Sequence, residues 1–529
     1  MSTSIYHKVG VASLLMMASV FLSRAMGLFR EMLIAYAAGA GASVDAYQIA
    51  FVIPEILNHI VASGFLSVTF IPIFSDYLAR NEEVEGWRIF SIILAGFGAV
   101  LVFFILIAEI FAPDLIRILA PGLKDPVVID SAVTMTRIIL PAQFFFFAGG
   151  LFMAVQFAKE RFFIPALAPL IYNLGIMAGG VVLGPWLKMH GFAWGVLAGA
   201  FVGNFWIQYV GARKAGMRLA LVFDFRHPDL KKYVLLTLPL MLGLTMTFST
   251  EIFFKFFGSY LPEGSIAGLN YGLRLMLMLV GLFGQAVGVA SFPFMARLAA
   301  EGRLGEMNRL LNQTLRYLAL VIPLCALFMV LRNEMVVVIF QRGRFDAQAT
   351  ALTASILPYL MIGAFAFAAQ TVVVRGFYAV QNTIFPAVFG TIAVMVSIPM
   401  YVYGMQAMGV RGVALAVSLA ALVQNILIYA VWNRRTQNHE SRIVYGFVLK
   451  MAGLSLCLGV VLEGFRRMFL SGPQMSGFFG SLMSCIVVGS VFGLILLVAA
   501  HLLRIEEIND MVRRIANRFG KIFPRRPSV

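Results

Sequence analysis

Three charged residues lie inside an apolar segment near the start of the sequence. Arg24, Arg30 and Glu31 fall within residues 9–36, which otherwise have the composition of a membrane helix. A full charge at bilayer depth is costly unless it faces a protein interior or a water-filled cavity. Two arginines and one carboxylate leave surplus positive charge, which predicts an anionic ligand held inside a membrane. The alternative is an arginine–glutamate pair that only fixes helix packing.

The helical repeat determines the directions in which Arg24, Arg30 and Glu31 point from the helix axis. At about 100° per residue, Arg24 and Glu31 point in nearly the same direction, whereas Arg30 is offset from Arg24 by roughly 120°. One arginine is then neutralised by the carboxylate while the other stays available. Guanidinium suits a phosphate ligand, because its fixed fork of donors matches phosphate oxygens.

A polar stripe follows on the second apolar segment, residues 44–74. Its members recur at helical spacing and are Asp45, Gln48, Glu55, His59 and Ser63, with Asn58 beside them. Such a stripe faces a cavity or another helix rather than lipid. Asp45 lies near the outer end and is also interpretable as a helix N-cap. His59 is also interpretable as a hydrogen-bonding group in helix packing.

Further polar positions occur in the second half of the chain. One face of residues 265–296 carries Asn270, Arg274, Gly281, Gln285 and Gly288. Arg274 has no acidic residue one turn away in the sequence, which favours a ligand-binding role. Within residues 232–257, the spacing of Glu251 and Lys255 predicts an internal ion pair, and ion coupling through Glu251 is the alternative.

The composition predicts a polytopic membrane protein. The chain has 529 residues, of which 60% are hydrophobic and 12% charged, values outside the range of soluble globular proteins. Apolar stretches of roughly 20 residues predict about 14 transmembrane helices. They lie at residues 9–36, 44–74, 88–112, 128–157, 163–187, 191–212, 232–257, 265–296, 308–331, 347–375, 382–405, 410–432, 443–464 and 476–503.

The motifs and the charge pattern exclude several classes of function. The sequence has no Walker loop, no zinc-protease or serine-hydrolase motif and no metal-spaced cysteine–histidine cluster, so we expect a transporter without cofactor or metal. The net charge of +16 collects in alternate short loops, which by the positive-inside rule places both termini in the cytoplasm. Without a basic and aromatic recognition module, we expect no nucleic-acid partner.

A weak internal repeat divides the chain. With a shift of about 221 residues, positions 71–73 match 292–294 and positions 165–166 match 386–387. The shift covers six predicted helices, so the halves are parallel repeats, which usually place a substrate cavity at their interface. The predicted organisation is an N-lobe at residues 1–215, a C-lobe at 216–436, two further helices at 437–503 and a tail at 504–529. The tail is basic and amphipathic, which predicts contact with anionic lipids.

The first predicted hairpin carries a specific pattern. Residues 23–31 read SRAMGLFRE, 44–47 read VDAY, 54–57 read PEIL, 70–72 read FIP and 271–275 read YGLRL. This pattern resembles the MurJ/MviN family of lipid II flippases, and the resemblance extends over essentially the whole chain.

The resemblance implies a fold, a substrate and a set of site residues. The fold is that of the multidrug/oligosaccharidyl-lipid/polysaccharide exporter superfamily, with two six-helix lobes in a V around a cationic cavity and a groove for the undecaprenyl tail on helices 13 and 14. The substrate is then lipid II, moved from the inner to the outer leaflet of the bacterial cytoplasmic membrane by alternating access. The protein is expected to be a monomer that works with the cell-wall synthesis machinery. The family's cavity positions correspond to Arg24, Arg30, Arg274, Glu31 and Asp45.

The chain also departs from the family pattern. Asn58 and His59 stand where an arginine pair is common, and Ser63 replaces a usual acidic residue. We keep Asn58 and His59 as expected substrate-binding residues, beside the cavity or gating residues Glu31, Asp45, Glu55, Asn270 and Gln285. The alternatives are an exporter of another polyprenyl-linked glycan and a drug/cation antiporter of the same superfamily.

Overall fold

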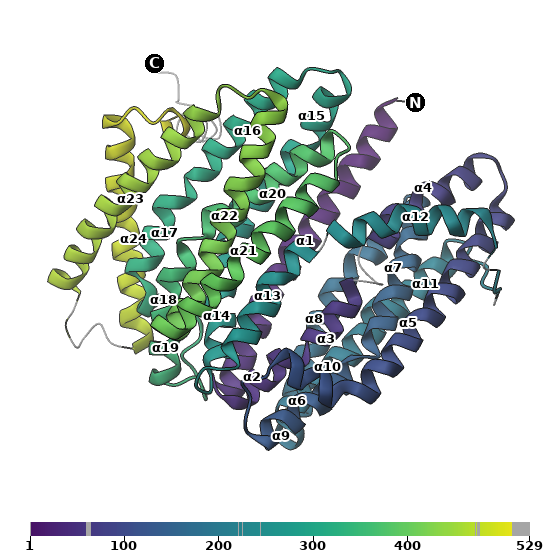
Figure 1. Ribbon diagram of the computed structural model, residues 1–529, viewed down its shortest axis with the longest axis horizontal. Coiled ribbons are helices and arrows are strands. Elements are labelled where there is room, and N and C mark those ends of the chain that lie inside the picture. The colour runs from purple at the N-terminus through teal and green to yellow at the C-terminus, as the bar shows by residue number, and fades with distance from the viewer. Residues whose placement is uncertain are drawn as a thin grey trace, which may run out of the picture. The chain divides into compact units, whose positions relative to one another are not determined.

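The computed structural model describes residues 2–59, 65–220, 222–224, 226–243, 245–470, 472 and 477–509. Within these residues the chain is helical and contains no strand (Figure 1). This confirms the predicted all-α class. Gln285 lies in a described helix, but its side chain is outside the described part, and Ser63 is outside it altogether.

The helices have the following bounds. The first half contains α1 (Ser2–Ala38), α2 (Ala42–Ala50), α3 (Val52–Leu57), α4 (Phe65–Ala79), α5 (Glu83–Leu119), α6 (Pro126–Ile139), α7 (Ala142–Ala158), α8 (Phe163–Val182), α9 (Gly184–Leu187), α10 (Met189–Gly199), the π-helix η2 (Ala200–Trp206), α11 (Ile207–Lys214), α12 (Pro228–Gly243) and α13 (Thr245–Gly258). The remainder contains α14 (Ser265–Val280), the π-helix η3 (Gly281–Gln285), α15 (Ala286–Ala300), α16 (Leu304–Ala319), α17 (Val321–Val330), α18 (Arg332–Ile339), α19 (Ala347–Met361), α20 (Ala364–Ala379), α21 (Ile384–Met408), α22 (Val410–Thr436), α23 (Ser441–Phe469) and α24 (Gly477–Leu502).

Each predicted span corresponds to one helix or to consecutive helices. The span expected at residues 410–432 is the single helix α22, and the one expected at 476–503 is α24. In the described chain, eight helices are long and apolar enough to cross a bilayer, and the bent pair α19–α20 makes a ninth. The total of 14 transmembrane helices stays a prediction, because the helices of an interrupted span are each too short to cross a bilayer.

Proline accounts for one interruption that matters for the site. Pro54 has no N–H and cannot donate to the carbonyl of Ala50, four residues earlier. α2 accordingly ends at Ala50 and α3 begins at Val52. The single polar stripe expected on residues 44–74 is therefore divided, with Asp45 on α2 and Glu55 on α3.

The bend of 46° between α19 and α20 is stabilised by a serine from another helix. Pro358 lies inside α19, three residues before its end, where its ring disfavours a straight helix. The hydroxyl of Ser418 on α22 lies 2.6 Å from the carbonyl oxygen of Tyr359 and 3.1 Å from that of Leu360. The carbonyl of Tyr359, next to the break, thus finds a donor within the protein, as a membrane span requires.

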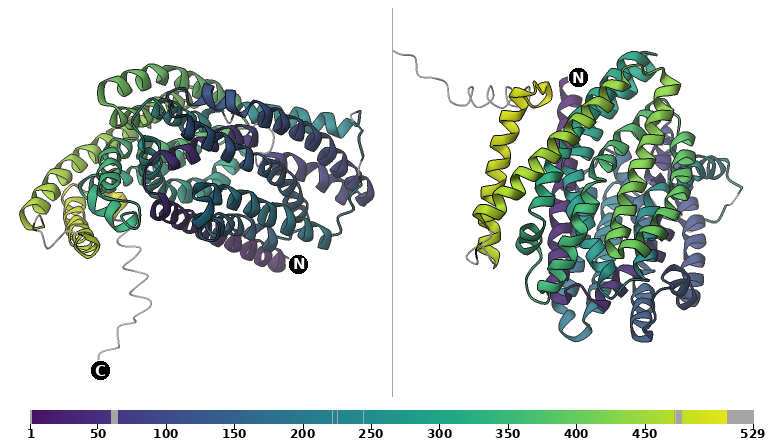
Figure 2. Two further views of the ribbon diagram at one scale, coloured as in Figure 1. Left: turned by 90° about the horizontal axis from the view of Figure 1, so that it is seen from below. Right: turned by 60° about the vertical axis from the view of Figure 1, so that its left-hand side comes forward.

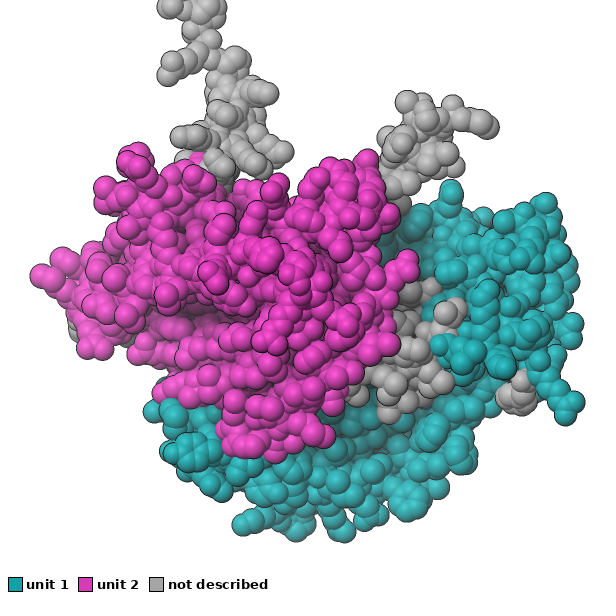
Figure 3. Space-filling model, turned by 45° about the horizontal axis from the view of Figure 1, so that its top comes forward, with its two compact units in different colours: residues 1–271, 342–349, 401–413 teal, residues 272–341, 350–400, 414–529 magenta. Residues whose placement is uncertain are grey.

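The chain forms two compact units, coloured separately in Figure 3. The first contains residues 1–271, 342–349 and 401–413, and the second contains residues 272–341, 350–400 and 414–529. The lobes expected from the internal repeat, 1–215 and 216–436, follow a different division and stay a prediction.

In the first unit, α8 packs against both α1 and α10. A Cβ atom added to Gly179 would lie 2.4 Å from the Cα of Gly195, so the close contact of α8 with α10 needs glycine. On α1, the hydroxyl of Ser19 donates to the carbonyl oxygen of Ala166 on α8 at 2.5 Å. This packing places α1 alongside α8 and orders the helices that carry the candidate site.

In the second unit, α23 and α24 lie side by side and pack on α17 and α18 (Figure 2). Their buried contact includes Leu331, Leu458, Leu462 and Val488. Large apolar side chains on the opposite face of α24, such as Leu494, are exposed. That exposure is expected of a helix that faces lipid.

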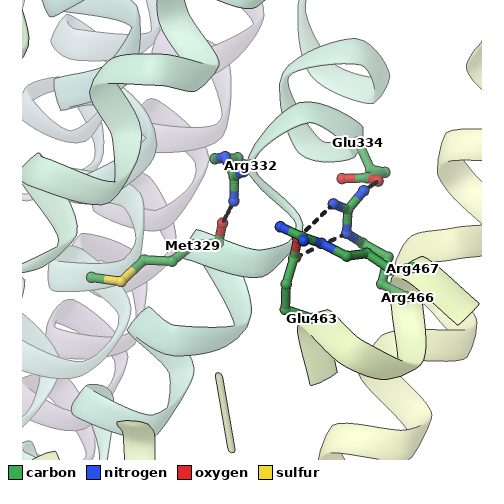
Figure 4. A network of polar contacts seen from close by, with 6 residues as sticks. All are labelled: Met329, Arg332, Glu334, Glu463, Arg466 and Arg467. Atoms are coloured by element: carbon green, nitrogen blue, oxygen red, sulfur yellow. Dashed lines mark hydrogen bonds and ion pairs between the residues drawn. The ribbon is translucent and has the colours of Figure 1, made fainter. Parts of the chain in front are cut away.

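A charged network joins α18 to α23 (Figure 4). Arg466 donates to Oε1 of Glu334 at 2.8 Å and to both carboxylate oxygens of Glu463 at 3.0 and 3.1 Å. Arg467 donates to Glu463 at 2.7 Å. The Arg466 and Glu334 side chains are 19% and 13% exposed, so this network is shielded from water and holds the final helix pair to the unit.

Arg466→Ala should therefore destabilise the protein by roughly 3 kcal/mol, because it takes the guanidinium away from the mostly buried carboxylate of Glu334, whereas Glu463 keeps Arg467. The measurement is the unfolding temperature of the purified protein in detergent. Arg467→Ala is the matched control, since its side chain is 73% exposed and exposed ion pairs contribute about 0–1 kcal/mol. Equal shifts for the two variants would contradict a stabilising role of Arg466.

Candidate ligand-binding site

Arg30 lies in a polar cluster within the first unit. Its guanidinium donates to Oε1 of Glu31 at 2.7 Å and to Oδ1 of Asn173 at 3.3 Å. The other carboxylate oxygen of Glu31 accepts from Nδ2 of Asn270 at 3.2 Å. The helices α1, α8 and α14 each supply part of this cluster.

Because Arg30 and Glu31 are largely buried, each charge is stable only with the other close by. Glu31 is 2% exposed, and the Arg30 side chain is 19% exposed. A carboxylate in such surroundings needs a cation and hydrogen-bond donors. The sequence left open which arginine Glu31 neutralises, and the structure shows Arg30 in this role.

The other two expected cavity arginines have different surroundings. Arg24 is exposed on α1, and Arg274 is half-buried on α14, one turn after Asn270. Arg24 and Arg30 belong to the first unit, whereas Arg274 belongs to the second. The gathering of all three arginines around one ligand stays a prediction.

Asp45 caps a helix other than its own. Its two carboxylate oxygens accept from the backbone N–H groups of Gly264 at 2.6 Å and Ala267 at 2.7 Å, at the N-terminus of α14. The N-cap position of its own helix α2 is Gly41, which has no side-chain cap. A carboxylate is favourable at a helix N-terminus, because it meets unsatisfied N–H groups and the positive end of the helix dipole. Asp45 is therefore a helix cap, as one interpretation of the sequence had it, but it caps α14 and not its own helix α2.

Two further hydrogen bonds are made to backbone carbonyls at the C-terminal end of α1. The Tyr271 hydroxyl donates to the carbonyl oxygen of Gly39 at 2.9 Å, and the N–H of Arg344 donates to that of Tyr36 at 2.9 Å. Gly264 has φ +83°, and a Cβ atom there would lie 2.3 Å from the carbonyl oxygen of Ala40. The loop after α1 and the loop before α14 therefore meet closely around the carboxylate of Asp45.

The predicted pair between Glu251 and Lys255 is corrected by the structure. Nζ of Lys255 lies 3.1 Å from Oε2 of Glu55 on α3. Lys255 is 2% exposed, so its charge requires a nearby carboxylate. The packing of α13 against α3 supplies a partner 200 positions away, which spacing along one helix does not reveal.

The remaining expected site residues lie near this pair. Asn58 and His59 follow α3 directly and are half-buried. His59 is within electrostatic range of Glu251 on α13. The structure thus brings Glu55 on α3, and His59 just after α3, close to α13, which carries Glu251.

Sequence reasoning missed two members of these clusters. Asn173 was not singled out, although it is an amide inside the apolar span 163–187. Lys255 was considered only as a partner of Glu251. In both cases the available signal was a polar side chain surrounded by apolar residues. The grouped guanidinium, ammonium, carboxylate and amide groups can hold and orient a charged ligand.

Comparison with known proteins gives a consistent result. The family model described as lipid II flippase MurJ matches residues 34–484. A probable lipid II flippase MurJ from Buchnera aphidicola subsp. Baizongia pistaciae is 27% identical over 464 residues, covering 87% of this chain and 90% of the relative. Lipid II flippase MurJ from Burkholderia cenocepacia is 26% identical over 455 residues, covering 84% and 87%.

Solved structures show the same fold. A lipid II flippase MurJ in an inward closed conformation superposes with a TM-score of 0.74 at 22% identity, covering 93% of this chain and 100% of that one. An inward-facing MATE family multidrug resistance transporter of the MOP superfamily gives a TM-score of 0.65 at 13% identity, covering 78% and 94%. At these identities the likeness concerns the fold alone.

Proposed function

The chain belongs to the lipid II flippase MurJ family, and from this premise we propose that it moves lipid II from the inner to the outer leaflet of the bacterial cytoplasmic membrane. Lipid II is the peptidoglycan precursor, a disaccharide peptide attached to undecaprenyl pyrophosphate. The observation that carries the proposal is the family match over residues 34–484.

The pyrophosphate is the part of the substrate that arginines recognise. Arg24 and Arg274 are the groups that bind it, through the match of guanidinium donors to phosphate oxygens. Arg30 has a second task, because it also neutralises Glu31 at 2.7 Å. Asn58 and His59 contact the substrate head group in place of the family's common arginine pair.

Alternating access requires that each end of the cavity open in turn. The carboxylate of Asp45, which accepts from Gly264 and Ala267, holds the end beyond α1 closed. Opening this end breaks those two bonds and the contacts of the neighbouring loop. Asp45 is thus a gating residue whose cap stabilises one of the two states.

The proposal also specifies the membrane location, the lipid contacts, the ion coupling and the partners of the protein. The protein has several apolar spans and works as a monomer in the cytoplasmic membrane, with both termini in the cytoplasm and no chemical step of its own. The exposed faces of α23 and α24 accommodate the undecaprenyl tail. The basic tail that the sequence predicts to contact anionic lipids lies, beyond residue 509, outside the described residues. Glu251, close to His59, is the candidate for ion coupling. The cell-wall synthesis machinery is the expected partner.

The test is rescue of a bacterium depleted of its own lipid II flippase. Expression of this chain should restore growth and should make lipid II accessible to an externally added enzyme that cleaves it. Native mass spectrometry of the purified protein then identifies which polyprenyl pyrophosphate co-purifies. Membrane insertion without rescue, together with retention of a different polyprenyl-linked glycan, would replace lipid II as the substrate.

A further inference from the structure

A cavity of about 240 Å³ lies within the second unit. Residues of α16, of the start of α23 and of the segment after α24 line it. The helices α16, α23 and α24 all belong to candidate membrane spans. The cavity lies at the start of α23, just past the end of α24 and beside residues 309–317, in the first half of the span Leu304–Val330. Lipid head groups are the molecules found at this depth of a membrane.

The cavity wall carries charges of both signs. Arg316 forms an ion pair with Glu507, and Nε of Arg309 lies 3.3 Å from Oε1 of Glu440. Glu506 adds a third carboxylate to the wall. Three carboxylates beside two guanidinium groups disfavour a purely anionic ligand and favour one that also carries a positive charge.

Two buried polar atoms in the wall lack a hydrogen-bond partner among the described residues. They are Nε of Arg316, a donor, and Oε2 of Glu507, an acceptor. Glu507 is 5% exposed, so bulk water does not satisfy its free oxygen. Buried polar atoms of this kind cost free energy until a ligand or a water molecule pairs with them. A ligand with an acceptor and a donor close together satisfies both.

Apolar surface continues from the rim of the cavity. Ile443 lines it and is 55% exposed, Leu449 on the same helix is 75% exposed, and Leu502 at the end of α24 is 73% exposed. A small soluble zwitterion has no apolar chain that could cover this surface. Acyl chains attached to the same head group would cover it.

We propose that this cavity binds the head group of a zwitterionic phospholipid of the phosphatidylethanolamine type. The phosphate accepts from Arg316, the ammonium group donates to Glu507, and the acyl chains lie along α23 and α24. None of the residues that line the cavity is among those proposed to bind the lipid II head group, and only the α23–α24 surface, proposed above for the undecaprenyl tail, is shared. Its existence does not depend on the flippase proposal.

The experiment uses the delipidated full-length protein in detergent. Phosphatidylethanolamine and phosphatidylglycerol with identical acyl chains are titrated separately, and binding is read by native mass spectrometry and by the unfolding temperature. The ethanolamine lipid should bind more tightly and raise the unfolding temperature more. Water-soluble phosphoethanolamine, which has the head group alone, should bind far more weakly.

Variants connect binding to the cavity. Glu507→Gln should weaken binding of the ethanolamine lipid about tenfold, the effect of one lost charged hydrogen bond. Glu506→Gln alters an exposed residue, and it should weaken binding severalfold even if Glu507→Gln fails to fold. Glu306→Gln is the control, because this exposed carboxylate on α16 pairs with Arg303 and does not line the cavity.

Several outcomes would overturn the proposal. Equal affinity for the two lipids would remove the zwitterion preference, and equal affinity for phosphoethanolamine and the lipid would assign the site to a soluble ligand. Unchanged binding in both cavity variants would place the lipid elsewhere. All of these readouts concern binding, so they are independent of growth rescue.

Discussion

Arg30→Ala should abolish growth rescue and lower the free energy of unfolding by roughly 3–5 kcal/mol, the usual cost of leaving a buried charge without its partner. The reason is that Glu31, 2% exposed, would lose the guanidinium that now donates to it at 2.7 Å, and the amide of Asn270 at 3.2 Å carries no charge to replace it. The measurements are growth of the flippase-depleted strain and unfolding of the purified protein in detergent.

A double variant separates the two tasks of Arg30. Arg30→Met combined with Glu31→Gln removes both charges, so it should recover most of the lost stability. If Arg30 also binds the substrate pyrophosphate, this stable protein should still fail to restore growth. Rescue by the double variant would show that Arg30 serves only Glu31.

Arg24→Met is the matched comparison on the same helix. Arg24 is exposed, and an ion pair at an exposed position contributes only about 0–1 kcal/mol to stability. Loss of rescue by a stable Arg24→Met protein would support a direct contact with substrate. Full rescue would remove Arg24 from the site.

Asp45→Ala should shift the protein toward the state in which the end beyond α1 is open. The substitution removes the two acceptors of the Gly264 and Ala267 N–H groups at 2.6 and 2.7 Å. A lost helix cap costs up to about 2 kcal/mol, which corresponds to a roughly 30-fold change in the ratio of closed to open protein. We also expect reduced growth rescue, because the transport cycle needs both states.

The opening is measured with a reporter cysteine. Ser265→Cys places a thiol beside the cap at a position that is 3% exposed, in a background where Cys325, Cys457 and Cys485 are serine. A membrane-impermeant thiol reagent should label it roughly 30-fold faster in the Asp45→Ala protein. Asp45→Asn retains one acceptor oxygen and should give an intermediate rate.

Glu263→Gln is the control for the charge of this loop. Glu263 precedes Gly264 and is exposed, so its substitution removes a carboxylate without removing the cap. Labelling of the reporter should then match that of the parent protein. An unchanged rate in the Asp45→Ala protein as well would mean that Asp45 does not hold this end closed.

The helices were largely predictable because length and apolar character are local properties of the chain. The spans expected at residues 443–464 and 476–503 correspond to α23 and α24. Interruptions were harder to place. Pro358 disfavours a straight helix within residues 347–375, but the hydroxyl that donates to the carbonyl of Tyr359 at the bend comes from Ser418 on another helix.

The candidate site was predicted by residue type more successfully than by partner. The sequence predicted that Glu31 neutralises one of the two arginines without deciding which, and Glu31 pairs with Arg30. The four-residue spacing of Glu251 and Lys255 also predicted an ion pair within one helix. This prediction was wrong, because Lys255 lies 3.1 Å from Glu55 on another helix. Spacing identifies which groups can pair, but several carboxylates compete for one buried ammonium once helices pack.

By itself, the sequence determined that this is an all-α membrane protein with charges retained at bilayer depth, because apolar spans and the cost of burying a charge depend only on residue type and length. The tertiary structure decided which group satisfies each charge. Asp45 caps a helix that begins more than 200 positions later, and Lys255 pairs with a residue 200 positions earlier. Such partners are chosen by packing, since only the folded chain brings distant helix ends and side chains within hydrogen-bonding distance.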